Sequence, residues 1–150
     1  MHPTAERFQT RLRDLGLDAE VQELADSTRT AQEAAAAVGV EVGQIVKSLV
    51  FVDDEGPVLC LCAGDRRVDT PKLGSGVRQA NGDEVRQATG YAIGGVPPVG
   101  HDRAVRTIVD ESLLRFDLVW CAAGTPHAVF PVAPAALIAS IPNAQVREIS

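Results

Sequence analysis

The fold is decided by residues 44–63, which read QIVKSLVFVDDEGPVLCLCA. Two apolar runs, at 45–52 and 58–63, combine β-branched with other apolar side chains, as largely buried strands do. Between them lies the polar segment Asp53-Asp54-Glu55-Gly56, which is typical of a tight turn. The stretch therefore predicts a β-hairpin of two largely buried strands.

Helical patterns lie on both sides of this hairpin. The spacing of apolar residues before Gly16 predicts a helix over residues 4–15. Thr30 opens a capping-box pattern, and the alanine-rich run up to Gly39 favours a second helix. Further helices are expected from Pro71, over 82–90 and over 134–140, and further strands over 91–93, 105–109, 118–122, 128–132 and 144–149. This irregular interleaving predicts a single α+β domain over residues 1–150 with a mixed sheet.

The composition is that of an ordinary globular protein. Hydrophobic residues make up 45% and charged residues 23% of the 150 residues. The formal net charge of -6 argues against a protein that coats nucleic acid through bulk electrostatics, so any RNA contact must be local. The first residues lack a signal-peptide pattern, no apolar run is long enough to cross a bilayer, and the three cysteines favour reduced thiols. We therefore expect a cytoplasmic protein with no membrane partner.

Lys47 is one of only two lysines and lies inside an apolar run. Burying its ammonium group there costs free energy unless the group is paired or lines a wet cleft. A lysine whose stem packs while its head reaches solvent at a sheet edge explains the same pattern. The residues alone leave both interpretations open.

A second candidate is the loop AAGTPH at residues 122–127, which follows a predicted strand. Small residues let a ligand approach the main chain, and free N–H groups in such a loop can bind an oxyanion. A plain hairpin turn has the same composition. His127 can act as a base or as a donor to a sugar, although a histidine near the start of a strand is more often structural.

Other signatures are weaker. The loop at 94–100 lacks the spacing of a dinucleotide- or phosphate-binding motif, and its prolines remove N–H donors. No CxxC or HxxxH spacing indicates a metal site, and the apolar surroundings of Cys121 favour core packing. A mixed-charge stretch contains Arg66, Arg67, Lys72, Arg78 and Arg86. Within it, Lys72 and Arg78 have no immediate acidic neighbours in sequence, so this stretch is the best candidate for contacting phosphates.

Four segments, at 26–35, 43–51, 89–100 and 124–127, together resemble the YbaK family of prolyl-tRNA synthetase-associated editing domains. The resemblance extends over about residues 20–145 with the segments in the expected order. It implies a mixed, barrel-like sheet surrounded by helices. It also implies hydrolysis in trans of the ester of mischarged tRNA, with a small amino acid such as alanine, serine, threonine or cysteine on tRNA-Pro or a related tRNA. No cofactor and no metal are expected.

The resemblance also assigns roles to residues. Lys47 is implied to place the terminal adenosine and the ester of the substrate, and the loop at 124–127 to face the scissile carbonyl. Catalytic roles are expected for Lys47, Gly124, Thr125 and His127, substrate binding for Thr30, Ser48, Ile93, Gly94, Gly95, Pro97 and Ala123, and tRNA binding for Arg67, Lys72 and Arg78. The expected partner is the acceptor end of aminoacyl-tRNA. An aminoacyl-tRNA synthetase stays open as a second partner, and no DNA or membrane partner is expected.

This chemistry needs little from side chains, because an aminoacyl ester is already activated. Main-chain N–H groups near Gly124 would stabilise the oxyanion while a bound water attacks the carbonyl carbon. Two rival interpretations stay open. One is a non-catalytic module that binds an aminoacyl or nucleotide group and acts with a synthetase partner. The other is a thiol-dependent hydrolase that uses Cys121.

Overall fold

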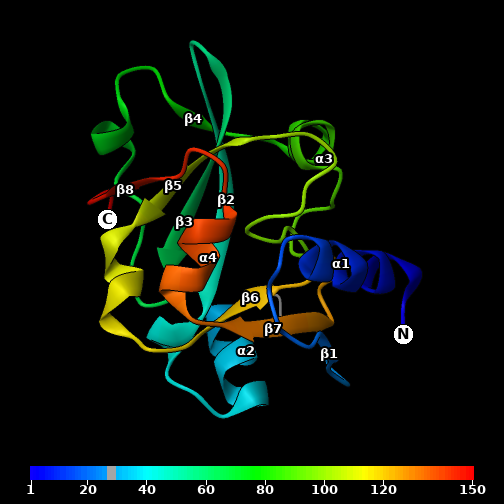
Figure 1. The fold of residues 1–150 in the computed structure, drawn as a ribbon. Helices are drawn as coiled ribbons and strands as arrows, with labels where there is room; N and C mark the ends of the chain where they lie inside the picture. The colour runs from blue at the N-terminus through cyan, green and yellow to red at the C-terminus, as the bar shows by residue number, and fades with distance from the viewer. Residues whose placement is uncertain (27–29) are drawn as a thin grey trace.

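The computed structural model describes residues 1–26 and 30–150, whose strands form two sheets with helices packed around them (Figure 1). The strands are β1 (Gln22–Glu23), β2 (Val46–Asp53), β3 (Gly56–Ala63), β4 (Arg78–Gln79), β5 (Arg106–Asp110), β6 (Val119–Ala122), β7 (Ala128–Val132) and β8 (Gln145–Arg147). The α-helices are α1 (Pro3–Asp14), α2 (Ala31–Val38), α3 (Gly82–Thr89) and α4 (Pro134–Ser140), and short 3-10 helices cover Val42–Gln44, Thr70–Leu73 and Glu111–Arg115. The predicted α+β class is confirmed. Residues 27–29, which belong to the first segment of the family resemblance, lie outside the described residues.

The larger sheet has five strands in the order β4-β2-β3-β5-β8. The predicted hairpin is confirmed, since β2 and β3 pair antiparallel from Val46–Ala63 to Asp53–Gly56. On the other side of β3, β5 pairs with it in parallel, and β8 pairs in parallel with β5. The sheet is therefore mixed, as predicted, and β3 is its most buried strand: residues 59–63 have no exposed surface.

The smaller sheet has three strands in the order β1-β7-β6, all antiparallel. An isolated parallel bridge between Ile45 and Trp120 joins its β6 to the residue before β2. The described strands thus form two open sheets linked at one corner, and the closed, barrel-like sheet that the resemblance implied is not confirmed. In the described ranges, no helix has both the length and the apolar character needed to cross a membrane.

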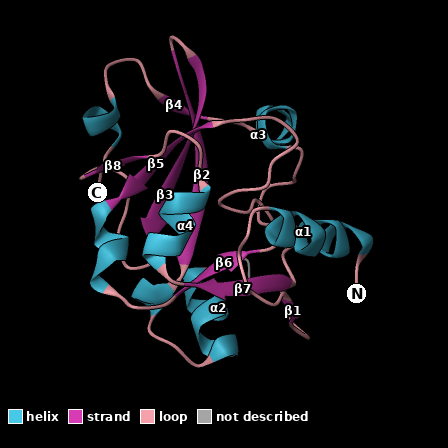
Figure 2. Cartoon of the chain, viewed as in Figure 1, coloured by secondary structure: helices cyan, strands magenta, loops and turns pink. Residues whose placement is uncertain are grey.

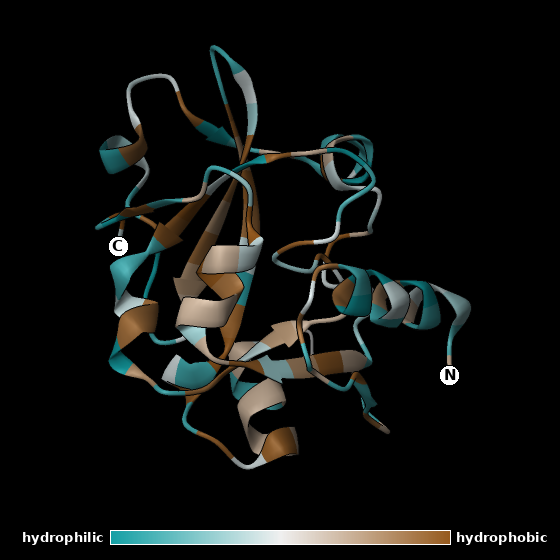
Figure 3. Cartoon of the chain, in the orientation of Figure 1, coloured by the Kyte–Doolittle hydropathy of each residue, from teal (hydrophilic) through white to brown (hydrophobic). Residues whose placement is uncertain are grey.

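One continuous core joins both sheets to α1 and α4. Phe8 of α1 is fully buried, and its ring centroid lies 5.3 Å from that of Phe130 in β7. Leu137 of α4 belongs to the same buried cluster, together with Leu59 and Leu61 of β3. Figure 3 shows hydrophobic residues along the central strands, with hydrophilic residues gathered on α1, α3 and the outer turns.

The predicted helix signals are confirmed in detail. Thr30 caps α2, because its hydroxyl accepts a hydrogen bond from the Glu33 N–H at 3.1 Å. Gly39 then ends this helix in the left-handed conformation, which a residue with a side chain adopts only at a cost. The start and the end of α2 are therefore determined by local sequence.

The strand predicted over residues 91–93 is wrong. The Tyr91 N–H donates to the Thr89 hydroxyl at 3.1 Å instead of to a neighbouring strand. The Gly95 N–H donates to the Ala92 carbonyl at 3.0 Å, which closes a turn. Figure 2 shows the resulting long loop between α3 and β5.

Candidate active site

A cleft of about 450 Å³ lies where α2, β2, the loop after α3 and the smaller sheet meet. It is lined by Thr30–Gln32 and Ala34, residues 45–50, Gly64, Gln79 and Ala80, Val85, Ile93, Gly94 and Val96, Trp120–Ala122 and Val129. A volume in this range suits a small-molecule group rather than a whole macromolecule. The cleft brings together five residues predicted from the sequence, namely Thr30, Lys47, Ser48, Ile93 and Gly94.

Lys47 lines this cleft from β2, where its backbone pairs with that of Cys62 in β3. Its ammonium group donates a hydrogen bond to the main-chain carbonyl of Arg66. Both interpretations of the sequence are thus partly right, because the side chain is half-buried with a carbonyl partner at its head, and it also lines a cleft. A neutral carbonyl partner leaves the positive charge uncompensated and available to a polar ligand.

Ser48 and Trp120 each contribute a buried polar atom to the same cleft wall without a hydrogen-bond partner. These atoms are the Ser48 hydroxyl oxygen and the Trp120 indole nitrogen, and nothing in the described part of the chain bonds to either. Buried polar groups in folded proteins are nearly always paired, so unpaired ones on a cleft wall indicate where a ligand binds. Trp120 was missed by the sequence reasoning, since a single tryptophan in an apolar strand looks like core.

The loop at 124–127 packs against the loop that carries Gly94 and Gly95. None of its four residues is among the described residues that line the cleft. A side-chain carbon added at Gly95 would lie 2.7 Å from the Gly124 carbonyl oxygen and 2.8 Å from the Thr125 Cα, so the two loops pack main chain against main chain. Gly95 is therefore required by this close approach.

An oxyanion role was predicted for main-chain N–H groups near Gly124, and several of these groups already donate to other partners. The Gly124 N–H donates to the Gly95 carbonyl at 3.0 Å, and the Ala123 N–H donates to the Ala128 carbonyl at 2.9 Å. The His127 N–H donates to the Thr125 hydroxyl at 3.3 Å. Within the described residues, the Thr125 N–H is left as the free donor of this loop. The correction follows from loop packing, which the sequence does not show.

Other predicted residues lie outside the cleft lining. Pro97 and Ala123 are buried beside it, with Ala123 fully covered. Lys72 and Arg78 have no immediate acidic neighbours in sequence, but in the fold Lys72 pairs with Glu148 at 2.6 Å and Arg78 with Glu84 at 2.7 Å. Arg67 is exposed and forms no ion pair with any of the described residues. Of the three predicted tRNA-binding residues, Arg67 is thus the one whose charge is unpaired.

Helix α1 supports the loop that carries Gly94 and Gly95. The Arg11 guanidinium donates to the Gly100 carbonyl at 2.8 Å and to the Tyr91 hydroxyl at 3.0 Å, and it pairs with Asp102 at 2.7 Å. The Tyr91 hydroxyl in turn donates to the Gly100 carbonyl at 3.0 Å. Both ends of the loop between α3 and β5 are thereby fixed to one helix.

The structure gives no support to a cysteine nucleophile. Cys60, Cys62 and Cys121 are all free and buried. Cys121 reaches the cleft wall, but burial raises the pKa of its thiol far above the ordinary value, which keeps it protonated. Among the described residues, no group of histidine, cysteine and acidic side chains is placed to hold a metal ion.

Comparison with known proteins agrees with this geometry. Residues 25–139 match the family model described as "Aminoacyl-tRNA editing domain". The chain is 33% identical over 120 residues to "Uncharacterized protein YwhH" of Bacillus subtilis, covering 77% of this chain and 76% of that protein. It is 29% identical over 127 residues to the Enterococcus faecalis protein named "Putative Cys-tRNA(Pro)/Cys-tRNA(Cys) deacylase EbsC", covering 81% of this chain and 77% of the other.

A solved structure supports the same assignment over the whole chain. It is described as the "Crystal structure of a putative trans-editing enzyme for prolyl tRNA synthetase", shares 49% sequence identity, and superposes with a TM-score of 0.92 over 100% of this chain and 98% of that one. With a family model that matches most of the chain and relatives that match nearly all of it, this protein belongs to the aminoacyl-tRNA editing domain family.

Proposed function

We propose that this protein hydrolyses the ester bond of mischarged aminoacyl-tRNA in trans, with a small amino acid such as alanine, serine, threonine or cysteine on tRNA-Pro or a related tRNA. The observation that carries the proposal is the cleft in which Lys47 and Ser48 lie side by side on β2 in a chain of the editing family. The names of two relatives, which mention a Cys-tRNA(Pro) deacylase and trans-editing for prolyl tRNA synthetase, point to the same class of substrate.

In the proposed mechanism, a water molecule attacks the ester carbonyl carbon and the ribose hydroxyl leaves. Negative charge develops on the carbonyl oxygen in the transition state, where nearby donors stabilise it. The Lys47 ammonium group lines the cleft and supplies positive charge there. The Thr125 N–H has no partner among the described residues, but loop 124–127 lies outside the cleft lining, so the proposed role of this N–H requires the bound ester to extend to that loop. His127 stays the proposed donor to the ribose. No covalent intermediate is required.

The walls of the cleft favour a small amino acid side chain. Val50, Val85 and Val96 line the cleft together with Ser48. Apolar walls alone discriminate weakly between side chains that differ by one small group, by about 10- to 200-fold. We therefore expect the enzyme to exclude large side chains by size and to discriminate among small ones through polar contacts.

Binding of the tRNA is proposed to rest on few contacts. Arg67 follows Arg66, whose carbonyl accepts the hydrogen bond from Lys47, so the proposed phosphate contact lies close to the cleft. Each phosphate contact adds about one to the slope of log affinity against log salt concentration. With a formal net charge of -6, the chain itself repels the remaining RNA, so weak binding or a synthetase partner that presents the substrate is expected.

The test measures release of labelled amino acid from tRNA-Pro charged with alanine, serine, threonine or cysteine. Wild type should release one or two of them, and Lys47→Ala should lower kcat/KM by about 100-fold or more, the effect of losing one transition-state donor. Arg13→Ala, which removes an exposed arginine of α1 outside the cleft lining, is the matched control and should change kcat/KM by less than about twofold. Release no faster than the spontaneous rate from all four would refute the proposal and leave the non-catalytic binding module as the better interpretation.

A further inference from the structure

The outer edge of β2 is open over a short length between two neighbours. At the far end of β2, Phe51 and Val52 pair with β4, and the Ala80 N–H donates to the Val50 carbonyl at 2.9 Å. At the near end, Ile45 bridges to β6. Between these points residues 47–49 form no ladder pair with any described strand on the side away from β3, and residues 45–50 line the cleft.

The main chain of Ser48 faces the gap. In an antiparallel pair, alternate residues direct both their N–H and their C=O groups toward the same neighbour. The Ile45 carbonyl accepts from the Gly64 N–H on the β3 side at 2.8 Å, whereas the Val50 carbonyl faces β4. By this alternation, the N–H and C=O groups of Ser48 point away from β3, and Ser48 belongs neither to the described β4 ladder nor to the described bridge to β6.

A ligand that fits this edge offers one donor and one acceptor with the spacing of a single amino acid residue. A residue in an added antiparallel strand offers this donor and this acceptor when it exchanges both N–H···O bonds with the residue opposite. An aminoacyl ester carries the same pair of groups on neighbouring atoms, since its α-ammonium group donates and its ester carbonyl accepts. Its size also suits a gap that is one residue pair long.

We propose that the aminoacyl group of the substrate binds to Ser48 as a one-residue β-strand, an inference that rests on the proposed function. Its α-ammonium group donates to the Ser48 carbonyl, and its ester carbonyl accepts from the Ser48 N–H. Recognition of the amino acid is then carried by main-chain atoms of β2, which no ordinary side-chain substitution removes.

This pairing also fixes where the substrate side chain lies. Residues opposite each other in an antiparallel pair point their side chains to the same face. Ser48 shares a face with Val46 and Val50, which belong to the main buried cluster, and its own hydroxyl has no partner. The side chain of an L-amino acid would therefore lie beside the Ser48 hydroxyl, in the cleft that Val85 also lines.

The first arm of the test removes the donor from the substrate. Alanyl-tRNA and propionyl-tRNA have the same acyl chain, except that the propionyl group lacks the α-ammonium. We expect kcat/KM, divided by the spontaneous hydrolysis rate of each ester, to be at least about tenfold lower for the propionyl ester, since a hydrogen bond to a charged group is lost. Equal normalised values would overturn the proposal.

The second arm removes the N–H from the protein. Proline is tolerated in a strand where the N–H faces away from the neighbouring strand, so Ser48→Pro deletes the proposed donor without breaking a bond to β3. We expect Ser48→Pro to lose at least about tenfold in kcat/KM, and Ser48→Ala, which keeps the N–H and removes only the hydroxyl, to lose clearly less than Ser48→Pro. Should Ser48→Pro fail to fold, replacement of the Ser48 amide by an ester makes the same deletion. Full activity in a folded protein without this N–H would overturn the proposal.

A binding measurement separates this inference from the proposed function. The probe is 3′-deoxy-3′-(L-alanylamino)adenosine, which carries an amide in place of the ester, and its propionylamino counterpart is the control. Only the alanyl probe should slow hydrogen exchange at the Ser48 N–H markedly. Hydrolysis without such protection would refute the inference alone. Protection without hydrolysis of any charged tRNA would refute the proposed enzyme and retain the binding mode.

Discussion

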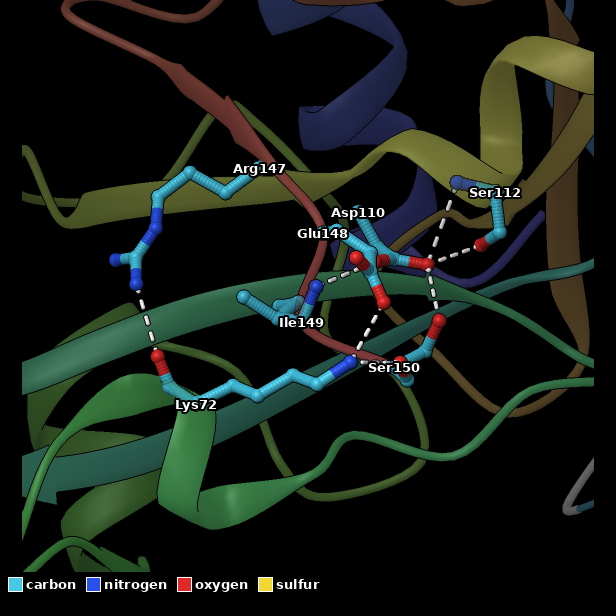
Figure 4. A network of polar contacts seen from close by, with 7 residues as sticks. All are labelled: Lys72, Asp110, Ser112, Arg147, Glu148, Ile149 and Ser150. Atoms are coloured by element: carbon cyan, nitrogen blue, oxygen red, sulfur yellow. Dashed lines mark hydrogen bonds and ion pairs between the residues drawn. The ribbon is translucent and has the colours of Figure 1, made fainter.

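Polar groups at two places in the larger sheet, the end of β5 and the middle of β2, differ in how fully they are hydrogen-bonded. At the end of β5, Asp110 has no exposed surface, and its carboxylate accepts from the Ile149 N–H at 2.8 Å, from the Ser150 hydroxyl at 2.8 Å and from both the N–H and the hydroxyl of Ser112 (Figure 4). Around it, Lys72 pairs with Glu148. In β2, by contrast, the Ser48 hydroxyl lacks a partner among the described residues, and Ser48 belongs to no described ladder on the side away from β3.

This difference distinguishes polar groups that stabilise the fold from polar groups that are available to bind a ligand. Four donors converging on one buried carboxylate hold the segment after β8 against β5, so this network stabilises the fold. Polar groups without partners lower stability, and a fold tolerates them where a ligand completes the bonding. The two places should therefore respond differently to substitution: Asp110 through the free energy of unfolding, and the middle of β2 through activity.

The largest expected effect on stability comes from Asp110→Ala. It leaves the Ile149 N–H and the other donors to the carboxylate without an acceptor in a buried site. We expect the free energy of unfolding to fall by about 3 kcal/mol, measured by urea denaturation. Activity per folded molecule should be unchanged, because the site of substitution lies outside the cleft lining. A loss below about 0.5 kcal/mol would contradict the stabilising role of this network.

The same carboxylate makes stability depend on pH. Burial alone would raise the pKa of Asp110, but the hydrogen bonds from Ser112, Ile149 and Ser150 outweigh it and hold the pKa below the ordinary value. A lowered pKa in the folded state means that the contribution is fully present above about pH 4 and is lost as the pH falls through the folded-state pKa. The Asp110→Asn variant should show a weaker loss of stability in acid than wild type.

Gly95→Ala changes the loop beside the cleft, and we expect it to lower stability less than Asp110→Ala does. The added methyl group would approach the Gly124 carbonyl oxygen to 2.7 Å, so the two loops must separate. We expect about 2 kcal/mol less stability together with a clear loss of kcat/KM in folded protein. Gly82→Ala is the control, because its methyl group has no neighbour closer than 3.8 Å and the residue starts a helix. Unchanged activity in Gly95→Ala would show that loop spacing does not matter to the site.

A matched pair of serine substitutions sharpens the comparison further. Ser112→Ala removes a hydroxyl that donates to Asp110 and should cost about 1 kcal/mol. Ser48→Ala removes a hydroxyl without a partner and should cost nothing or stabilise slightly. Thermal unfolding of both variants measures the difference. Equal losses would mean that the Ser48 hydroxyl is bonded in solution, by water or by the chain.

The smallest expected effect is that of thiol alkylation. Iodoacetamide reacts with thiolates. All three cysteines are buried. Burial is the main cause that raises the pKa of the Cys121 thiol, and it raises the pKa of Cys60 to about 12 and that of Cys62 to about 11. Treatment of the native protein should leave activity unchanged, and mass spectrometry should show unmodified thiols. Inactivation that tracks modification of Cys121 would revive the thiol-dependent mechanism.

Much of the fold was predictable because its signals are local. The hairpin at 44–63, the Thr30 cap and the helix over 134–140 each follow from neighbouring residues, and all three are confirmed. The strand predicted over 91–93 failed because the Thr89 side chain takes the N–H that a strand would have paired. The openness of the sheets depends on which distant strands meet, and a local pattern does not encode this.

The site was predictable in residue identity rather than in contacts. Lys47 stood out as a charged residue in an apolar strand, the family resemblance added Ser48, and the cleft contains both. The engagement of the Gly124 N–H by Gly95, and of Lys72 by Glu148, joins residues that lie far apart in the sequence. The sequence did not indicate Trp120 as a site residue, because only the structure shows that its buried indole nitrogen has no hydrogen-bond partner among the described residues.

Helix α1 determines where the chain can be cut when this domain is fused into another protein. The family model begins at residue 25, after α1, yet Phe8 packs on Phe130 and Arg11 holds the Gly100 carbonyl. A chimera cut at the family boundary would expose the Phe130 ring to water and release one end of the loop that carries Gly94 and Gly95. A transferable editing module therefore has to include the N-terminal helix, or obtain an equivalent brace from the protein that receives it.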